Sequence, residues 1–375
     1  MSARFLTVVL ERAFNMRDGF GREIDYMRIS VIDSCNLNCY YCNPCDNNEH
    51  CHALNILSVK EVLCIVRAAT RLGIKHFRLT GGEPLLHPQL DEMVLQIKKI
   101  PGVSSVSLTT NAVLLVQHAK WLKEAGIDSI NVSLDTIDAS EYERITKKPL
   151  LEEVKNGINA AIECGIRVKI NVVLTPQTDV VALTRYVAKK GTDIRFIEMM
   201  PVGEGHTNGV EPYKKVIGTL SKLYGEPCRI NTEKTKEINS GNDKRKIPDN
   251  GPAEYYIFPE LGIRVGLIQA IHGKFCDTCN RIRVTADGRL MPCLGSSVTM
   301  DLVPDSCEFT DDLEKDFVIV QALKAAIKAK PGCHNFNDNA VTYTKTTETK
   351  TVETKTTELK AAEVNAARNM SRIGG

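Results

Sequence analysis

The chain has 375 residues, 43% of them hydrophobic, which is enough to bury a core of ordinary size without disulfide bonds. Its 48 basic and 46 acidic residues leave a net charge of +2, so the composition does not favour nucleic acid or an anionic membrane as a partner. No apolar run approaches the roughly 18 residues of a membrane span. We therefore expect a soluble, cytoplasmic protein with no nucleic-acid partner and no membrane partner.

After an N-terminal extension at residues 1–27, short β-branched runs alternate with longer helical patterns. This alternation is typical of repeated βα units on a parallel sheet. The predicted strands lie at residues 28–32, 76–80, 103–109, 129–135, 167–174 and 193–199. Six units fall short of the eight of a closed barrel, so the sequence predicts an α/β fold with an incomplete (β/α)6 TIM-type barrel over residues 28–225.

Polar or glycine-rich groups follow every predicted strand. They are Cys35, residues 81–83, residues 109–111, Asp135, Asn171 and Glu198. Barrels of βα units keep their chemistry at the carboxyl ends of the strands. Any one of these groups is explained by ordinary loop polarity, but their recurrence favours a shared site at this end.

Three cysteines follow the first strand at C-x3-C-x2-C spacing, namely Cys35, Cys39 and Cys42. In a reducing compartment, thiols at such short spacing usually bind metal. Three thiolates would leave one iron of a cubane iron-sulfur cluster open to a substrate or cofactor. Two alternatives stay open: a zinc site, and a closed cluster in which Cys45 supplies a fourth thiolate.

Past Pro201 the βα pattern stops, and residues 226–340 are predicted to form a C-terminal domain carrying a second iron-sulfur cluster. Cys276, Cys279 and Cys293 give C-x2-C-x13-C spacing, again with three thiols. A zinc knuckle completed by Cys307 or His272 is the alternative.

The end of the chain has a different composition. Residues 344–358 repeat a five-residue pattern of Thr, Lys and Glu that has no apolar face. We expect a flexible tether over residues 341–360, followed by a tail over residues 361–375 that ends in two glycines.

The first cysteine loop, with the aromatic Tyr41 and the GGEP segment at residues 81–84, resembles that of radical S-adenosylmethionine (SAM) enzymes. Within that superfamily the chain resembles the GTP 3′,8-cyclases nearly end to end. The matching segments are DGFGREIDYMRISVIDSCNLNC, RLTGGEPLL, VSLD, IRFIEMMP, FCDTCNRIRVTADG and the terminal GG.

The resemblance implies an enzyme with two 4Fe-4S clusters that uses SAM to form a 5′-deoxyadenosyl radical. The radical takes hydrogen from C3′ of GTP, and C3′ then closes onto guanine C8 to give 3′,8-cyclo-7,8-dihydro-GTP, the first step of molybdenum cofactor synthesis. It also implies an electron donor such as flavodoxin or ferredoxin, and cyclic pyranopterin monophosphate synthase downstream. A homodimer stays open.

The resemblance also assigns roles to residues. For SAM it implies Tyr41, Gly81, Gly82, Glu83, Thr109, Thr110, Ser133, Lys169 and Met199. For the triphosphate it implies Arg28, His76, Arg78, Arg195, Arg281 and Arg283. For catalysis it implies Arg28, Arg78, Arg283, Gly374 and Gly375, and for the clusters the two cysteine triplets.

The sequence departs from the family pattern at His76, where a lysine is usual, at Ala112, where a glycine is usual, and in the repeat before the tail. Two other functions are kept as alternatives. A peptide-modifying radical SAM enzyme would share the cysteine loops but not the paired arginines or the terminal glycines. A non-enzymatic protein would bind zinc and no iron.

Overall fold

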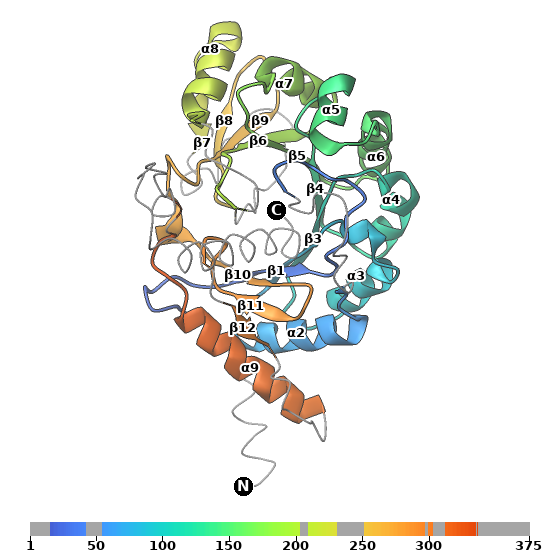
Figure 1. The fold of residues 1–375 in the computed structure, drawn as a ribbon, viewed down its shortest axis with the longest axis vertical. Coiled ribbons are helices and arrows are strands. Elements are labelled where there is room, and N and C mark those ends of the chain that lie inside the picture. Colours follow the sequence, from blue (N-terminus) through green and yellow to red (C-terminus); the bar gives the residue numbers. More distant parts are fainter. Residues whose placement is uncertain are drawn as a thin grey trace, which may run out of the picture.

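The computed structural model describes residues 16–42, 55–202, 209–230, 251–296, 299–302, 312–334 and 336. The described strands form one curved, twelve-stranded sheet in the order β12-β11-β10-β1-β2-β3-β4-β5-β6-β9-β8-β7 (Figure 1). Strands β1 to β6 are neighbours in chain order and run parallel. The predicted α/β fold with an incomplete barrel is therefore confirmed.

All six predicted barrel strands are present, with small shifts at their ends. They are β1 (Tyr26–Ser30), β2 (His76–Thr80), β3 (Ser105–Thr110), β4 (Ser129–Ser133), β5 (Val168–Val173) and β6 (Asp193–Ile197). Helices cover the outer face of the sheet (Figure 1): α2 (Val59–Arg71), α3 (Leu90–Lys98), α4 (Leu115–Glu124), α5 (Ala139–Thr146), α6 (Leu151–Glu163) and α7 (Val180–Lys189).

The C-terminal half extends both edges of this sheet. Strand β9 (Arg264–Ile268) runs parallel to β6, and β10 (Arg281–Val284) runs parallel to β1. Beyond them, antiparallel partners follow on each side: β8 (Glu254–Ile257) and β7 (Cys228–Ile230), and β11 (Arg289–Met291) and β12 (Met300–Asp301). Because β9 and β10 end up at opposite sides of an open seam, the barrel does not close in the described part of the chain.

The remaining helices lie outside the barrel. A π-helical turn at Tyr213–Ile217 leads into α8 (Gly218–Tyr224), and α9 (Asp312–Lys328) packs against α2 (Figure 1). Arg71 and Asp316 form an ion pair of 3.0 Å between α2 and α9. The predicted domain boundaries stay a prediction, since the sheet is continuous across them. None of the described helices is long and apolar enough to cross a bilayer.

Side-chain alternation along the strands explains why the inner face of this curved sheet is polar. Met27 and Ile29 of β1, like Phe77 and Leu79 of β2, are fully buried in the core beneath the helices. The intervening residues of each strand point to the opposite face, because successive strand side chains alternate. On that inner face the strands carry arginine, serine, threonine and asparagine, so the interior of the barrel is polar.

Candidate functional site: two cysteine triplets and a buried arginine cluster

The first cysteine triplet lies on the loop that leaves β1. Its backbone is held against the end of α5, since Asn38 N donates to Thr146 O at 3.0 Å and Tyr40 N donates to Ile145 O at 3.1 Å. The Tyr41 hydroxyl donates to Asp135 Oδ2 at 2.5 Å, which ties the loop to the end of β4. The loop is therefore fixed at the carboxyl end of the barrel, as the sequence predicts.

The thiols of this triplet share a buried setting. Burial raises the pKa of Cys35 to about 12 and that of Cys42 to about 11. The pKa of Cys39 is also raised well above its usual range, first by burial and then by the charge of Cys42. Such thiols stay protonated near neutral pH unless a metal cation takes the place of the proton, so three close thiols fit a metal-bound group.

The donor set, three thiols on one loop, fits a sulfur-ligated metal group. A closed structural zinc site has four ligands, whereas three thiolates can bind three irons of a cubane and leave the fourth iron open.

Two glycines after β2 let the GGE segment lie directly on the cysteine loop. A Cβ at Gly81 would come 2.4 Å from Ile32 O, and one at Gly82 would come 2.2 Å from Ser34 O. Hydrogen bonds of 2.8 Å join Gly82 N to Ile32 O and Glu83 N to Ser34 O. Close packing against the loop is thus one reason for these glycines, and their contact with SAM stays a prediction.

Glu83 links three elements of the site. Its buried carboxylate accepts hydrogen bonds from Leu85 N at 3.0 Å, Thr110 Oγ1 at 2.6 Å and Asn111 N at 2.7 Å. Burial raises the pKa of Glu83 to about 7, although these donors oppose the shift. Thr110 therefore supports Glu83, whereas Thr109 faces the barrel interior, where its hydroxyl lies 3.4 Å from Arg78 Nη1.

The loop after β3 carries a strained residue. Ala112 has a φ of 66°, a left-handed conformation that favours glycine. It is fully buried, and its carbonyl oxygen would lie 2.3 Å from a Cβ placed at Gly157 on α6. The departure from the family pattern at this position thus falls where the backbone calls for glycine.

The predicted phosphate-binding arginines gather on the inner face where β10, β1 and β2 meet. The strand register places Arg28 directly between Arg78 and Arg283. One step toward the amino ends of the strands, Tyr26 lies between His76 and Arg281. Four of the predicted arginines therefore share two adjacent layers of the barrel.

Arg195 lies on the far wall, on β6. Its Nε donates to Asn171 Oδ1 at 2.9 Å. Gly266 on the neighbouring strand leaves space for it, because a Cβ there would lie 2.8 Å from Arg195 Cγ. Arg195 thus faces the same interior from the opposite side.

The arginine cluster is electrostatically unfavourable without an anion. Burial lowers the pKa of Arg28 well below its usual range, and the charge of Arg283 adds to this. Burial, then repulsion from Arg281, lowers the pKa of Arg283 to about 10. The Nη1 atom of Arg283 is buried without a hydrogen-bond partner among the described residues. These features fit a polyanionic ligand.

His76 stands where the family usually has a lysine. It lies in the layer of the barrel that is nearer the amino ends of the strands. Its Nδ1 lies 2.8 Å from Ser105 Oγ, and its Nε2 lies 4.0 Å from an oxygen of Asp25. Burial lowers the pKa of His76, with Lys75 adding to the effect and Asp25 opposing it. The ring is therefore neutral at pH 7.

The second cysteine triplet lies next to the arginines. Cys276 begins a 3-10 turn (η3, Cys276–Thr278), Cys279 follows it before β10, and Cys293 follows β11. Burial, and then the charge of Cys293, raise the pKa of Cys276. Burial would also raise the pKa of Cys279, but Lys330 and Arg281 outweigh it and lower that pKa.

Arg22 holds this second loop in place, and sequence reasoning missed it. Its guanidinium donates to the carbonyl oxygens of Cys276 at 2.7 Å, Gly332 at 3.0 Å and Pro331 at 2.6 Å. Asp18 fixes it from behind, with 2.6 Å between Nε and Oδ2. The DGFGR segment at residues 18–22 was a signal for this role, since a buried arginine needs both a carboxylate and carbonyl partners.

The other predicted SAM residues are distributed around the rim and the far wall. Ser133 is exposed at the end of β4. Lys169 and Met199 are buried, and Lys169 Nζ lies 5.9 Å from the centre of the Tyr255 ring. Gly374, Gly375 and Cys45 lie outside the described residues.

Glu198, beside Met199, also holds the second cysteine loop in place. The sequence pointed to Glu198 but not to the residues that it contacts. It accepts hydrogen bonds from Ile271 N at 2.7 Å and His272 N at 3.1 Å, and it also pairs with His272 Nδ1. These bonds fix the turn that precedes η3. The end of β6 thereby helps to position the second cysteine loop.

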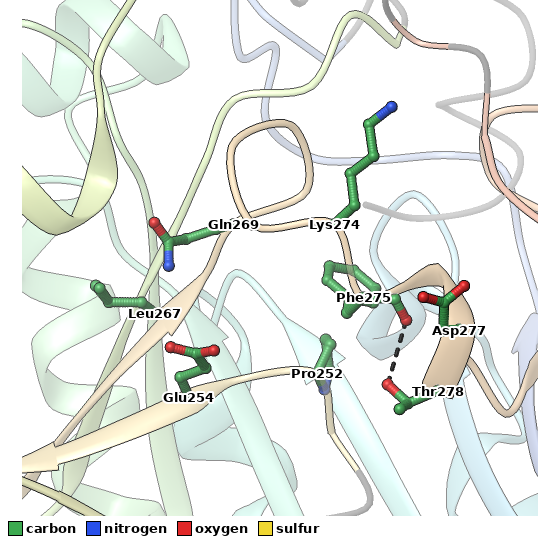
Figure 2. A pocket seen from close by; sticks show the side chains of 9 residues that line it. Pro252, Glu254, Leu267, Gln269, Lys274, Phe275, Asp277 and Thr278 are labelled. Atoms are coloured by element: carbon green, nitrogen blue, oxygen red, sulfur yellow. Dashed lines mark hydrogen bonds between the residues drawn. The ribbon is translucent and has the colours of Figure 1, made fainter.

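A pocket of about 250 Å³ lies at the open seam of the barrel. Figure 2 shows Glu254, Leu267 and Gln269 on the side of β8 and β9, facing Asp277 and Thr278 on the side of η3. It contains none of the residues predicted to bind SAM or triphosphate. The pocket is therefore a feature of the seam and not the predicted site itself.

Comparison with known proteins places this site in a family. Residues 29–182 match the radical SAM superfamily, and residues 192–336 match the family called Molybdenum Cofactor Synthesis C. A GTP 3′,8-cyclase of Clostridium perfringens is 36% identical over 324 residues, covering 86% of this chain and 95% of the relative. One of Listeria monocytogenes is 36% identical over 323 residues, covering 85% and 92%.

Among solved structures, Streptococcus suis SuiB has a TM-score of 0.53 at 15% identity, and the match covers 79% of this chain but 65% of SuiB. SuiB bound to its precursor peptide SuiA has a TM-score of 0.53 at 14% identity, covering 86% and 69%. This likeness concerns the fold alone. The extent and identity of the sequence matches establish that the chain belongs to the GTP 3′,8-cyclase family of radical SAM enzymes.

Proposed function

We propose that this protein is a GTP 3′,8-cyclase that converts GTP to 3′,8-cyclo-7,8-dihydro-GTP, the first step of molybdenum cofactor synthesis. In the reaction the hydrogen atom at C3′ of GTP passes to the 5′-deoxyadenosyl radical, and a bond forms between C3′ and C8 of guanine. One electron from the electron donor and one proton then convert the resulting radical to the product. Family membership supports the reaction class. The proposal rests on one observation: a cluster of buried arginines lies inside a polar barrel, and both cysteine triplets border that cluster.

Each triplet would hold one 4Fe-4S cluster. SAM bound at the first cluster supplies the 5′-deoxyadenosyl radical that starts the reaction. Cys35, Cys39 and Cys42 would hold that cluster, with the loop fixed by the Tyr41–Asp135 hydrogen bond and by the GGE segment. Cys276, Cys279 and Cys293 would hold the second, whose loop Arg22 and Glu198 fix in place.

The arginines would bind the triphosphate. A triphosphate carries about four negative charges, and the planar guanidinium matches pairs of phosphate oxygens. Arg28, Arg78, Arg281 and Arg283 line one wall and Arg195 the other. Binding an anion here would offset the burial, and the repulsion among arginines, that lower the pKa values of Arg28 and Arg283.

The SAM pocket is proposed at the carboxyl ends of the strands, from Gly81, Gly82, Glu83, Thr109, Ser133 and Met199, with Lys169 deeper on β5. Thr110 is assigned to the support of Glu83. The tail with Gly374 and Gly375 is proposed to complete the site. An electron donor such as flavodoxin or ferredoxin, a downstream cyclic pyranopterin monophosphate synthase and a cytoplasmic location belong to the same proposal, and a homodimer stays open.

Anaerobic incubation with GTP, SAM and reductant, followed by mass spectrometry of the nucleotide, tests the proposal. We expect a new nucleotide isomeric with GTP, formed together with methionine and 5′-deoxyadenosine. Recovery of unchanged GTP from protein that carries both clusters would contradict it and would favour a peptide-modifying enzyme. Zinc without iron after anaerobic purification would favour the non-enzymatic alternative.

A further inference from the structure

Tyr26 lies among the arginines, although nothing in the cysteine motifs points to it. It is the first residue of β1, and strand alternation places it on the inner face with Arg28. Its hydroxyl accepts a hydrogen bond from Nε of Arg78. Its ring lies 5.5 Å from Cζ of Arg281 and 6.0 Å from Cζ of Arg78. A single side chain therefore contacts a guanidinium on each neighbouring strand.

These contacts leave one phosphate-binding edge of Arg78 available. A guanidinium can bind an oxyanion through its two terminal nitrogens or through Nε and one terminal nitrogen. Tyr26 takes the Nε donor, and within the described part of the chain Nη1 of Arg78 has long contacts of 3.5 Å to Leu108 O and 3.4 Å to Thr109 Oγ1. The hydrogen bond from Nε thus restrains the guanidinium and leaves the edge formed by its two terminal nitrogens for an oxyanion.

A phenol suits this position better than a carboxylate would. Burial raises the pKa of Tyr26, but Arg78 and Arg28 outweigh it and lower that pKa, because both guanidiniums favour negative charge on the phenol oxygen. A carboxylate would form a full ion pair and compete with phosphate for the guanidinium. A phenol offers one acceptor and an aromatic face, which hold two cations without neutralising them.

We propose that Tyr26 is a positioning residue for the phosphate-binding arginines, holding Arg78 through its hydroxyl and Arg281 through its ring. This inference rests on the proposed function and adds a residue that supports GTP binding. Tyr26 acts through the arginines that bind the phosphate end of the nucleotide. Its loss should therefore weaken binding more for a nucleotide that carries more phosphates.

The test compares Tyr26→Phe with the unaltered protein, both carrying their clusters. The dissociation constants of GTP, GDP and guanosine are measured by equilibrium dialysis. Loss of one hydrogen bond to a charged group should raise the constant for GTP about tenfold. We expect a smaller rise for GDP and none for guanosine. The iron content and SAM binding should stay unchanged.

A second variant separates the ring from the hydroxyl. Tyr26→Leu also removes the aromatic face beneath Arg281, so GTP affinity should fall by a further factor of about three. The matched control is Tyr224→Phe, because the Tyr224 hydroxyl also accepts a hydrogen bond from an arginine Nε, that of Arg185 at 2.9 Å, on the exterior. This control should bind GTP as the unaltered protein does.

An unchanged GTP constant in Tyr26→Phe would overturn the inference. So would an equal loss of affinity for guanosine and GTP, since that pattern means general damage to the site. If the unaltered protein carrying its clusters does not bind GTP, the proposed function itself fails. If it binds GTP and Tyr26→Phe binds equally well, only the role of Tyr26 fails.

Discussion

The two cysteine triplets have the same number of thiols but opposite electrostatic surroundings. At the first, carboxylates add to the effect of burial, since Asp135 raises the pKa of Cys39 and of Cys42, and Glu83 raises that of Cys35. At the second, cations oppose burial, and Lys330 and Arg281 lower the pKa of Cys279. The first site is therefore electronegative and the second electropositive.

This difference matches the charges of the two proposed ligands. SAM carries a positive sulfonium, which a nearby carboxylate attracts, and GTP carries a polyphosphate, which arginines attract. Cysteine spacing cannot show which site binds which ligand, because each triplet offers three thiols and would leave one iron of its cluster open. The residues around the thiols separate them, so the predictions below act on one site at a time.

The largest expected effect comes from removing one thiol from each triplet in turn. We expect Cys35→Ala to abolish SAM cleavage, because the first site loses a ligand of the cluster that reduces SAM. We expect Cys276→Ala to retain some SAM cleavage but to form no cyclised nucleotide. Chromatography of 5′-deoxyadenosine and of the nucleotide product measures both.

The exposed Cys228 lies on β7, away from both triplets, and Cys228→Ala provides the control. It should retain both activities. Intact cyclisation in Cys276→Ala would mean that the second triplet does not hold the nucleotide, and the two-site comparison would be wrong.

The next effect concerns the end of the chain. Deleting Gly374 and Gly375 should abolish cyclisation while sparing both clusters and SAM binding, because the tail is predicted to act beside the triphosphate. A synthetic peptide ending in Ile-Gly-Gly should restore part of the activity. Full activity in the shortened protein would assign the tail to the dispensable ends that most chains carry.

A smaller effect is expected at His76, which lies in the second, electropositive site, in the layer nearer the amino ends of the strands. Burial holds the pKa of His76 below its ordinary value of 6.5, so the ring gains its charge only as the pH falls below that value. GTP affinity of the unaltered protein should therefore rise as the pH falls through this range. His76→Lys carries a permanent charge and should bind GTP a few times more tightly at pH 7 to 8, with little pH dependence.

Equilibrium dialysis across about pH 5.5 to 8 measures this effect. Lys75→Ala is the control, since Lys75 is adjacent in sequence but more exposed. It should keep a pH dependence, moved to higher pH because Lys75 lowers the pKa of His76. Equal affinity of His76→Lys and the unaltered protein at every pH would place His76 outside the phosphate pocket.

The smallest effect lies in the loop that frames the electronegative site. Ala112→Gly should raise the free energy of unfolding by up to about 1 kcal/mol, because alanine is disfavoured at a φ of 66° and glycine is not. Anaerobic thermal denaturation measures this as a small rise in Tm. Ala119→Gly, inside helix α4, should instead lower Tm, and a fall in both variants would exclude strain at Ala112.

The barrel was predictable because its signals are local. Short β-branched runs at β1 to β6, and helical patterns between them, located the strands within a few residues. The seam was not predictable, because the pairing of β9 with β6 and of β10 with β1 joins segments far apart in sequence. These pairings complete the polar interior, since β10 brings Arg281 and Arg283 beside Arg28.

The cysteine triplets and arginines were identified from motifs, but their supports were not. Arg22, Tyr26 and Glu198 act through partners far away in sequence, and no spacing rule connects Arg22 to Cys276 or Glu198 to His272. For Gly81 and Gly82, the sequence pointed to a ligand, and the structure adds packing against the cysteine loop. Motifs thus identify the groups that react, and the fold identifies those that hold them.

The most direct test of the two-site account is electron paramagnetic resonance of reduced protein, titrated separately with SAM and with GTP. The reconstituted protein should contain about eight irons per chain. In Cys276→Ala the remaining signal should respond to SAM and not to GTP, and in Cys35→Ala it should respond to GTP and not to SAM. A single cluster signal in the unaltered protein, or one cluster that responds to both ligands, would contradict the account.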